Sequence, residues 1–259
     1  MLDTADQNFQ SNSIVWIVYL TSLAFNQIQE MSSIKIGGSH MENTNKLNDK
    51  IYSLFKLSTY IIGPLIGMAL WIMVVSSIMC GGMETLVESM NGFIETFTIF
   101  SIPMLLFLAV IPLIVKVKYE NKSFKELGLI YTSNKRNNIL LALNMVVLMV
   151  MGVRFVTLDI NSGEILTMFI HILCIGVSEE IMLRSVVFDE VGSKFNKVIT
   201  IIITALIFSF IYHSGSDLQS NILIRFPLGL ILGFLRSKTN NVYNSIAFHT
   251  WYNMFVLTI

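Results

Sequence analysis

Long apolar runs limit what this chain can fold into more than any other feature. Only 13% of its 259 residues are charged, about half the usual share in a soluble domain. A helix of about 20 apolar residues is long enough to cross a bilayer, and runs of roughly this length recur along the sequence. The runs cover about 57–80, 97–117, 138–156, 164–188, 197–213, 221–235 and 241–259. We therefore expect an all-α, polytopic transmembrane helical bundle with about seven spanning helices.

Charges between these runs alternate in sign along the chain. Basic residues precede the first run and fill the second, fourth and sixth connections, whereas acidic residues occupy the first, third and fifth. Because basic loops remain in the cytoplasm, the alternation predicts an inside start near Met41 and an outside C-terminus. The net charge of zero gives no reason to expect a nucleic-acid partner.

The N-terminal segment needs separate treatment. Gly38-Ser39-His40-Met41 resembles the scar of a protease-cleavable tag, so residues 1–40 are either a tag or fused segment, or a native N-terminal extension. Their apolar stretch, Ile14 to Phe25, is short for a span and could lie at the interface instead. If it does span, the helix count becomes eight. We expect N-terminal transmembrane helices and a cytoplasmic loop over 41–137, and a helical core over 138–259. The loop covers 118–137 and could hold a short surface helix.

Two acids and an arginine stand near the end of one apolar run. Glu180 and Arg184 are four residues apart, which places them on one helix face in the favourable order for an ion pair. Glu179 points about 100° away. The spacing predicts that Arg184 neutralises Glu180 and leaves Glu179 free to accept a proton from water. The alternative is a purely structural ion pair near the membrane interface, with the guanidinium group of Arg184 extending into water.

Histidines occur in the two apolar regions that follow. His213 ends the segment that begins at Phe208, and His249 lies within the last run with Asn253 one helical turn further on. Polar side chains that share a face at membrane depth favour the bundle interior. His213 could also be a satisfied interface residue, and His249 and Asn253 could serve helix–helix hydrogen bonding. His171 is interpreted as a packing or supporting residue.

In combination these motifs resemble the CPBP family of intramembrane proteases. Glu-Glu-x-x-x-Arg at 179–184 is followed by a histidine at the end of the next run and by His-x-x-x-Asn at 249–253. The family includes the type II CAAX prenyl endopeptidases and the bacterial Abi proteins linked to bacteriocin immunity. The resemblance covers roughly residues 138–259. Ser209 replaces the aromatic residue that the second motif of the family usually carries.

The resemblance implies an intramembrane endopeptidase that cleaves a membrane-associated or lipidated peptide or protein. Glu179 would be the base that activates water, and His213 would orient or deprotonate that water. His249 and Asn253 would stabilise the oxyanion, because donors aimed at developing charge accelerate acyl transfer. Together with the basic loops, the resemblance points to a multi-pass protein of a bacterial cell membrane whose site opens to the cytoplasm.

The resemblance also assigns supporting roles and leaves a metal open. Glu180 and Arg184 would support the first catalytic helix. Two histidines and a carboxylate can bind zinc, so Glu179, His213 and His249 are the candidate ligands if zinc is used. The family has been described both as metalloproteases and as metal-free enzymes, and this sequence contains no His-Glu-x-x-His motif. We expect no cofactor, with zinc as the alternative.

Other functions fit the same residues. A non-catalytic membrane scaffold or a bacteriocin-immunity protein could use the polar cluster as a structural hydrogen-bond network. Intramembrane ionisable groups also occur in transporters, but the sequence shows no inverted repeat.

The depth of the candidate residues along their helices differs. Counted at 1.5 Å per residue, Glu179 and His249 lie roughly 12–14 Å from the cytoplasmic helix ends and His213 roughly 24 Å, so convergence requires tilt or shifted helix boundaries.

Overall fold

The structure is a computed structural model that describes residues 40–81, 92–157 and 162–258, with side chains from Ile51 onward except that of Ser162. All regular elements in these ranges are helices, and several contain wide turns with i→i+5 hydrogen bonds, labelled η. In chain order they are α2 (His40–Met79), α4 (Phe93–Thr96), η1 (Phe97–Ser101), η2 (Met104–Val110), α5 (Ile111–Ile114), η3 (Val115–Tyr119), α6 (Lys135–Val156), α7 (Ser162–Glu180), η4 (Ile181–Val187), α8 (Phe188–Gly192), α9 (Lys197–Ile207), η5 (Phe208–Tyr212), α10 (Leu218–Ser220), η6 (Asn221–Arg225), α11 (Phe226–Thr239) and α12 (Tyr243–Leu257).

The all-helical membrane fold predicted from the apolar runs is confirmed. By length and composition, five continuous helical rods in the described residues could cross a membrane: Ile51–Met79, Phe93–Tyr119, Lys135–Val156, Gly163–Gly192 and Leu218–Thr239. The remaining two predicted runs form the shorter apolar helix Lys197–Tyr212 and the 15-residue α12. The number of seven spans therefore stays a prediction, and the stretch from Ile14 to Phe25 lies outside the described residues.

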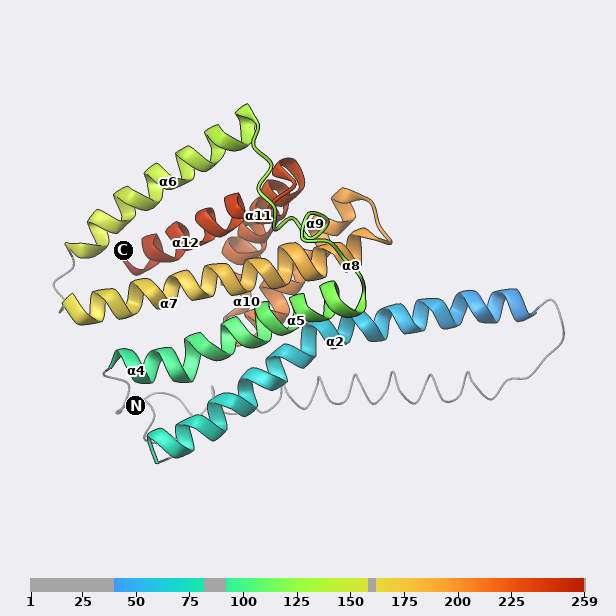
Figure 1. The fold of residues 1–259 in the computed structure, drawn as a ribbon, viewed down its shortest axis with the longest axis horizontal. Coiled ribbons are helices and arrows are strands. Elements are labelled where there is room, and N and C mark those ends of the chain that lie inside the picture. Colours follow the sequence, from blue (N-terminus) through green and yellow to red (C-terminus); the bar gives the residue numbers. More distant parts are fainter. Residues whose placement is uncertain (1–39, 82–91, 158–161, 259) are drawn as a thin grey trace.

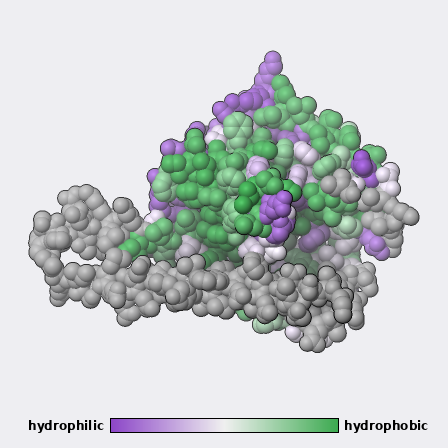
Figure 2. Space-filling model, turned by 180° about the vertical axis from the view of Figure 1, so that it is seen from behind, coloured by the Kyte–Doolittle hydropathy of each residue, from purple (hydrophilic) through white to green (hydrophobic). Residues whose placement is uncertain are grey.

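The rods lie roughly side by side, with α7 near the middle (Figure 1). On one flank α12 packs between α7 and α6, and on the other the rod from α4 to η3 separates α7 from α2. The short helix α9 packs against α11. Apolar side chains cover much of the face seen in Figure 2, which is the surface expected of a chain surrounded by lipid.

Small residues allow two of these helix pairs to approach closely. A Cβ atom at Gly229 of α11 would lie 3.0 Å from the Cα atom of Ala205 in α9, and one at Gly233 would lie 3.1 Å from the side chain of Ile201. At Gly176 in α7, a Cβ atom would lie 2.5 Å from Oγ1 of Thr250 in α12. Close backbone approach through small residues is typical of membrane helices, and here it joins α7 to α12, which carry the first and third motifs, and α9 to α11.

The short surface helix allowed for the loop 118–137 does not form. After η3 the chain makes a hydrogen-bonded turn, in which the amide of Leu129 donates to the carbonyl of Phe124 at 2.8 Å. Gly128 adopts a φ of 72°, which glycine accepts without steric cost, and this conformation bends the loop back. Leu127 is fully buried and anchors the turn against the bundle.

Candidate functional site

Glu180 is the centre of a buried polar cluster. Its side chain is fully buried at the end of α7, where the wide turn η4 begins. Arg184 donates from Nε to Oε2 of Glu180 at 3.3 Å. Nδ1 of His249 in α12 lies 3.2 Å from Oε1 of the same carboxylate. Glu180 therefore joins the first and third motifs directly.

Glu179 has a different environment from Glu180. Its side chain keeps 11% exposure, and its Oε2 atom lies 4.0 Å from Nε2 of His249. This oxygen is buried and has no hydrogen-bond partner in the described part of the chain. The imidazole of His249 thus lies between two carboxylates. A neutral imidazole that donates from Nδ1 to Glu180 has a lone pair on Nε2, on the side of Glu179.

Phe208 forms one wall of the cluster. The guanidinium carbon of Arg184 lies 5.8 Å from the centre of this phenyl ring. The same ring makes edge contacts with His249 at 5.7 Å and with His213 at 4.6 Å between ring centres. All three motifs consequently meet around Phe208, despite the different depths counted from the sequence.

His213 is held by the backbone of its own segment. Its Nδ1 atom lies 2.8 Å from the carbonyl oxygen of Phe208. Because a carbonyl only accepts, Nδ1 carries a proton, and in the neutral ring Nε2 is then an acceptor. The carbonyl of His213 accepts a hydrogen bond from Nδ2 of Asn221 at 3.1 Å. His213 itself is half-buried, so its free nitrogen is accessible to a small molecule.

Tyr212 adjoins the cluster, whereas no hydrogen bond in the described residues links Asn253 to it. Asn253 is half-buried one turn after His249, and no side-chain hydrogen bond involves it within the described ranges. The Tyr212 hydroxyl is buried without a hydrogen-bond partner in the same ranges, and it interacts electrostatically with Glu179. Sequence reasoning overlooked Tyr212 and also Asn221, although Tyr212 directly precedes the motif histidine. His171 lies apart from this group, with Nδ1 2.9 Å from Oγ of Ser101.

The proposed zinc ligands do not form a metal-binding group. Among the residues that the structure describes, no three His, Cys, Asp or Glu side chains gather in a way that could hold a metal ion. Nδ1 of His249 faces Glu180 and Nδ1 of His213 faces the Phe208 carbonyl, so only the Nε2 atoms of the two rings are open to a metal. In this arrangement Glu179, His213 and His249 are not gathered into a zinc site.

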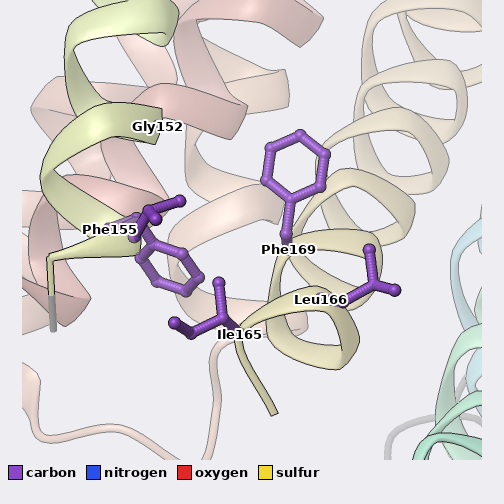
Figure 3. A pocket seen from close by; sticks show the side chains of 6 residues that line it. Gly152, Phe155, Ile165, Leu166 and Phe169 are labelled. Atoms are coloured by element: carbon purple, nitrogen blue, oxygen red, sulfur yellow. The ribbon is translucent and has the colours of Figure 1, made fainter. Parts of the chain in front are cut away.

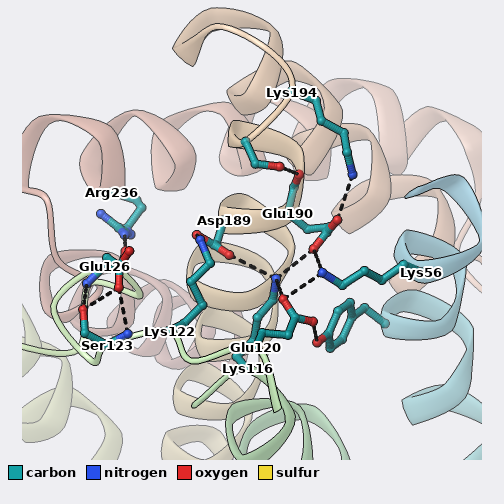
Figure 4. Close-up of polar contacts among 12 residues, drawn as sticks. Lys56, Lys116, Glu120, Lys122, Ser123, Glu126, Asp189, Glu190, Lys194 and Arg236 are labelled. Atoms are coloured by element: carbon teal, nitrogen blue, oxygen red, sulfur yellow. Dashed lines mark hydrogen bonds and ion pairs between the residues drawn. The ribbon is translucent and has the colours of Figure 1, made fainter. Parts of the chain in front are cut away.

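A second polar cluster lies at one end of the bundle (Figure 4). Nζ of Lys116 is fully buried and contacts three carboxylates, Glu120 at 3.0 Å, Asp189 at 3.0 Å and Glu190 at 2.8 Å. Three outer lysines complete the network, namely Lys56 on Glu120 and Glu190, Lys122 on Asp189, and Lys194 on Glu190. Burial acts to raise the pKa of Glu120, but hydrogen bonds from Lys56, Tyr60 and Lys116 outweigh it and lower that pKa. The network ties α2 and η3 to α8.

Arg236 of α11 connects this end of the bundle to the first motif. Its Nε atom donates to the carbonyl of Arg184 at 2.8 Å, and a terminal nitrogen donates to the carbonyl of Glu126 at 3.2 Å (Figure 4). Arg184 belongs to η4, where wide turns change the pattern of backbone hydrogen bonds. Arg236 therefore supports the backbone that carries Arg184 and holds the turn of the preceding loop.

An apolar pocket of about 440 Å³ lies elsewhere, between α6 and α7 (Figure 3). It is lined by Gly152, Phe155, Val156, Ile165, Leu166 and Phe169. No titratable side chain lines it, so it offers no acid, base or nucleophile for a reaction. Val156 and Leu166 are also exposed on the outer surface, which makes this pocket part of the apolar exterior.

The comparisons with known proteins bear on the same region. The family model for Rce1-like type II CAAX prenyl endopeptidases matches residues 161–255. No curated protein and no solved structure matches the chain. The matched range contains Glu179, Glu180, Arg184, His213 and His249, and the match supports an intramembrane CAAX-type protease at the level of the family. Residues 161–255 are thus similar to the Rce1-like family, and the resemblance to CPBP intramembrane proteases that the motifs indicate is confirmed.

Proposed function

We propose that this protein is an intramembrane endopeptidase that uses water, activated by glutamate and histidine, to cleave a membrane-associated or lipidated peptide. One observation carries the proposal. The buried Oε2 atom of Glu179 has no hydrogen-bond partner in the described residues and lies 4.0 Å from Nε2 of His249. A carboxylate left unbonded beside an imidazole is suited to bind and deprotonate a water molecule.

In the proposed reaction, Glu179 takes a proton from water as the water oxygen attacks the scissile carbonyl carbon. Nε2 of His213 accepts a hydrogen bond from the same water and orients it. The carbonyl oxygen becomes an oxyanion, which the Asn253 amide stabilises, and His249 can assist from Nε2 when both of its nitrogens are protonated. When the C–N bond breaks, Glu179 returns the proton to the leaving amine.

Glu180 and Arg184 position these groups rather than react. Glu180 contacts Nδ1 of His249 and so fixes the orientation of the ring, and Arg184 balances the buried charge of Glu180. The alternation of basic and acidic connections supports an opening toward the cytoplasm, and the family resemblance suggests a bacterial cell membrane.

The direct test is mass spectrometry of candidate membrane-associated peptides after incubation with the purified protein in isotopically labelled water. We expect two products, with one heavy oxygen in the new carboxylate, because water is the nucleophile. A non-catalytic scaffold or immunity protein would bind such a peptide and leave it intact. Binding without any product, over a range of lipidated and unlipidated peptides, would therefore contradict the proposal.

Metal analysis gives a second prediction. We expect purified, active protein to lack stoichiometric zinc and to keep its rate of hydrolysis after treatment with a chelator, because Glu179, His213 and His249 do not form a ligand group. Elemental analysis and the rate before and after chelation measure this. One zinc per chain, lost together with hydrolysis on His213→Ala, would show the mechanism to be wrong.

A further inference from the structure

Buried polar atoms without partners gather around the candidate site. In the described part of the chain they include Oε2 of Glu179, both terminal nitrogens of Arg184 and the hydroxyl of Tyr212. A buried polar group without a hydrogen bond costs about 1–3 kcal/mol. Atoms of this kind in one place point to a polar ligand that the protein binds there, such as water or the reacting part of a substrate.

Tyr212 is a neutral donor among these unpartnered groups. It is the last residue of η5 and directly precedes His213. Its ring packs against the apolar core that includes Phe208, and its hydroxyl is buried and interacts electrostatically with Glu179. Tyr212, His213 and Asn253 are each half-buried, so all three residues keep some exposure.

The hydrogen-bond acceptors of the site suit the attacking water, and its donors suit the scissile carbonyl of the substrate. Glu179 and Nε2 of His213 are acceptors, and they suit the protons of the attacking water. The scissile carbonyl oxygen needs donors instead. Arg184 pairs with Glu180 through Nε and is fully buried. Tyr212 and Asn253 are half-buried, and their phenol and amide are neutral donors with no hydrogen-bond partner in the described ranges.

We infer that Tyr212 is a further catalytic residue, whose hydroxyl donates a hydrogen bond to the scissile carbonyl oxygen and to the oxyanion formed from it. This inference rests on the proposed function. As water adds to the carbonyl carbon, the electron pair of the C=O bond moves onto that oxygen. The phenol holds the oxygen until the C–N bond breaks, and it keeps its own proton throughout.

The test compares Tyr212→Phe with Tyr60→Phe. Tyr212→Phe removes only the hydroxyl, and we expect kcat to fall by about 10²-fold with little change in KM, because an oxyanion donor acts in the transition state. Its thermal unfolding temperature should stay equal or rise, since no bond within the protein is lost. The Tyr60 hydroxyl donates to Glu120, so Tyr60→Phe should lower the unfolding temperature and leave kcat unchanged.

The outcomes separate the inference from the proposed function. If the wild type hydrolyses a peptide and Tyr212→Phe does so at the same kcat, only the role of Tyr212 is overturned. A drop in the unfolding temperature of Tyr212→Phe as large as that of Tyr60→Phe would show that the hydroxyl has a partner within the protein, and this also overturns the role. If the wild type hydrolyses no peptide, the proposed function falls and the assignment of Tyr212 falls with it.

Discussion

Glu179→Gln should lower the rate of peptide hydrolysis by about 10³-fold, the middle of the range that general-base catalysis supplies. An amide has nearly the same shape as the carboxylate but cannot accept the proton of water. The thermal unfolding temperature should change little, because Oε2 of Glu179 makes no hydrogen bond in the described residues. Initial rates by mass spectrometry and a thermal melt of the same detergent preparation measure both quantities.

Glu164→Gln is the matched control for this substitution. Glu164 is an exposed acid near the start of α7, the helix that ends with Glu179 and Glu180. The substitution Glu164→Gln should leave the rate of peptide hydrolysis and the thermal unfolding temperature at the wild-type values. Glu180→Gln cannot serve as this control, because Glu180 contacts both Arg184 and His249. Wild-type turnover in Glu179→Gln would exclude Glu179 as the base.

Lys116→Met should cost about 3–5 kcal/mol of the free energy of unfolding, the usual loss when one partner of a buried ion pair is removed. The substitution leaves the carboxylates of Glu120, Asp189 and Glu190 together without their shared buried cation. Methionine has a similar length, so the loss reports the charge more than the packing. Equilibrium unfolding of the wild type and the variant in mixed micelles with increasing denaturant measures the change in the free energy of unfolding.

Lys118→Met provides the comparison for Lys116. Lys118 lies two residues further along η3, is exposed and stands over the ring of Tyr119 at 5.9 Å. Surface contacts of this kind contribute about 1 kcal/mol or less. Equal stability losses in the two variants would mean that Lys116 is not the centre of the ion network.

Local patterns were enough to predict the helices and the order of the motifs. Apolar runs coincide with helices because each run must satisfy its backbone within the bilayer. Lys116 and Lys122 illustrate the limit of such patterns. By sequence both belong to the basic connection that follows the second apolar run. The structure pairs both with Asp189, about 70 residues further along the chain. No local signal encodes a contact of that range.

The second motif shows the same limit at the candidate site. The sequence places Ser209 where an aromatic residue is usual, with Phe208 beside it. Ser209 is buried and bonds its own helix, through Oγ to the carbonyl of Ala205 at 2.8 Å. The ring of Phe208 contacts both His213 and His249. Which aromatic faces the site depends on the wide turn η5, because i→i+5 bonding changes the angle between successive residues, and composition does not reveal that turn.

The contact at Gly176 has a consequence for how the protein can respond to changes in proton occupancy. Thr250 is the neighbour of His249, and its backbone nitrogen would lie only 3.4 Å from a Cβ atom at position 176. The approach of the two main chains at this point therefore depends on the missing side chain of Gly176, and this contact carries no charge. In the proposed reaction, protons can therefore move among the acids and the imidazole without altering this contact.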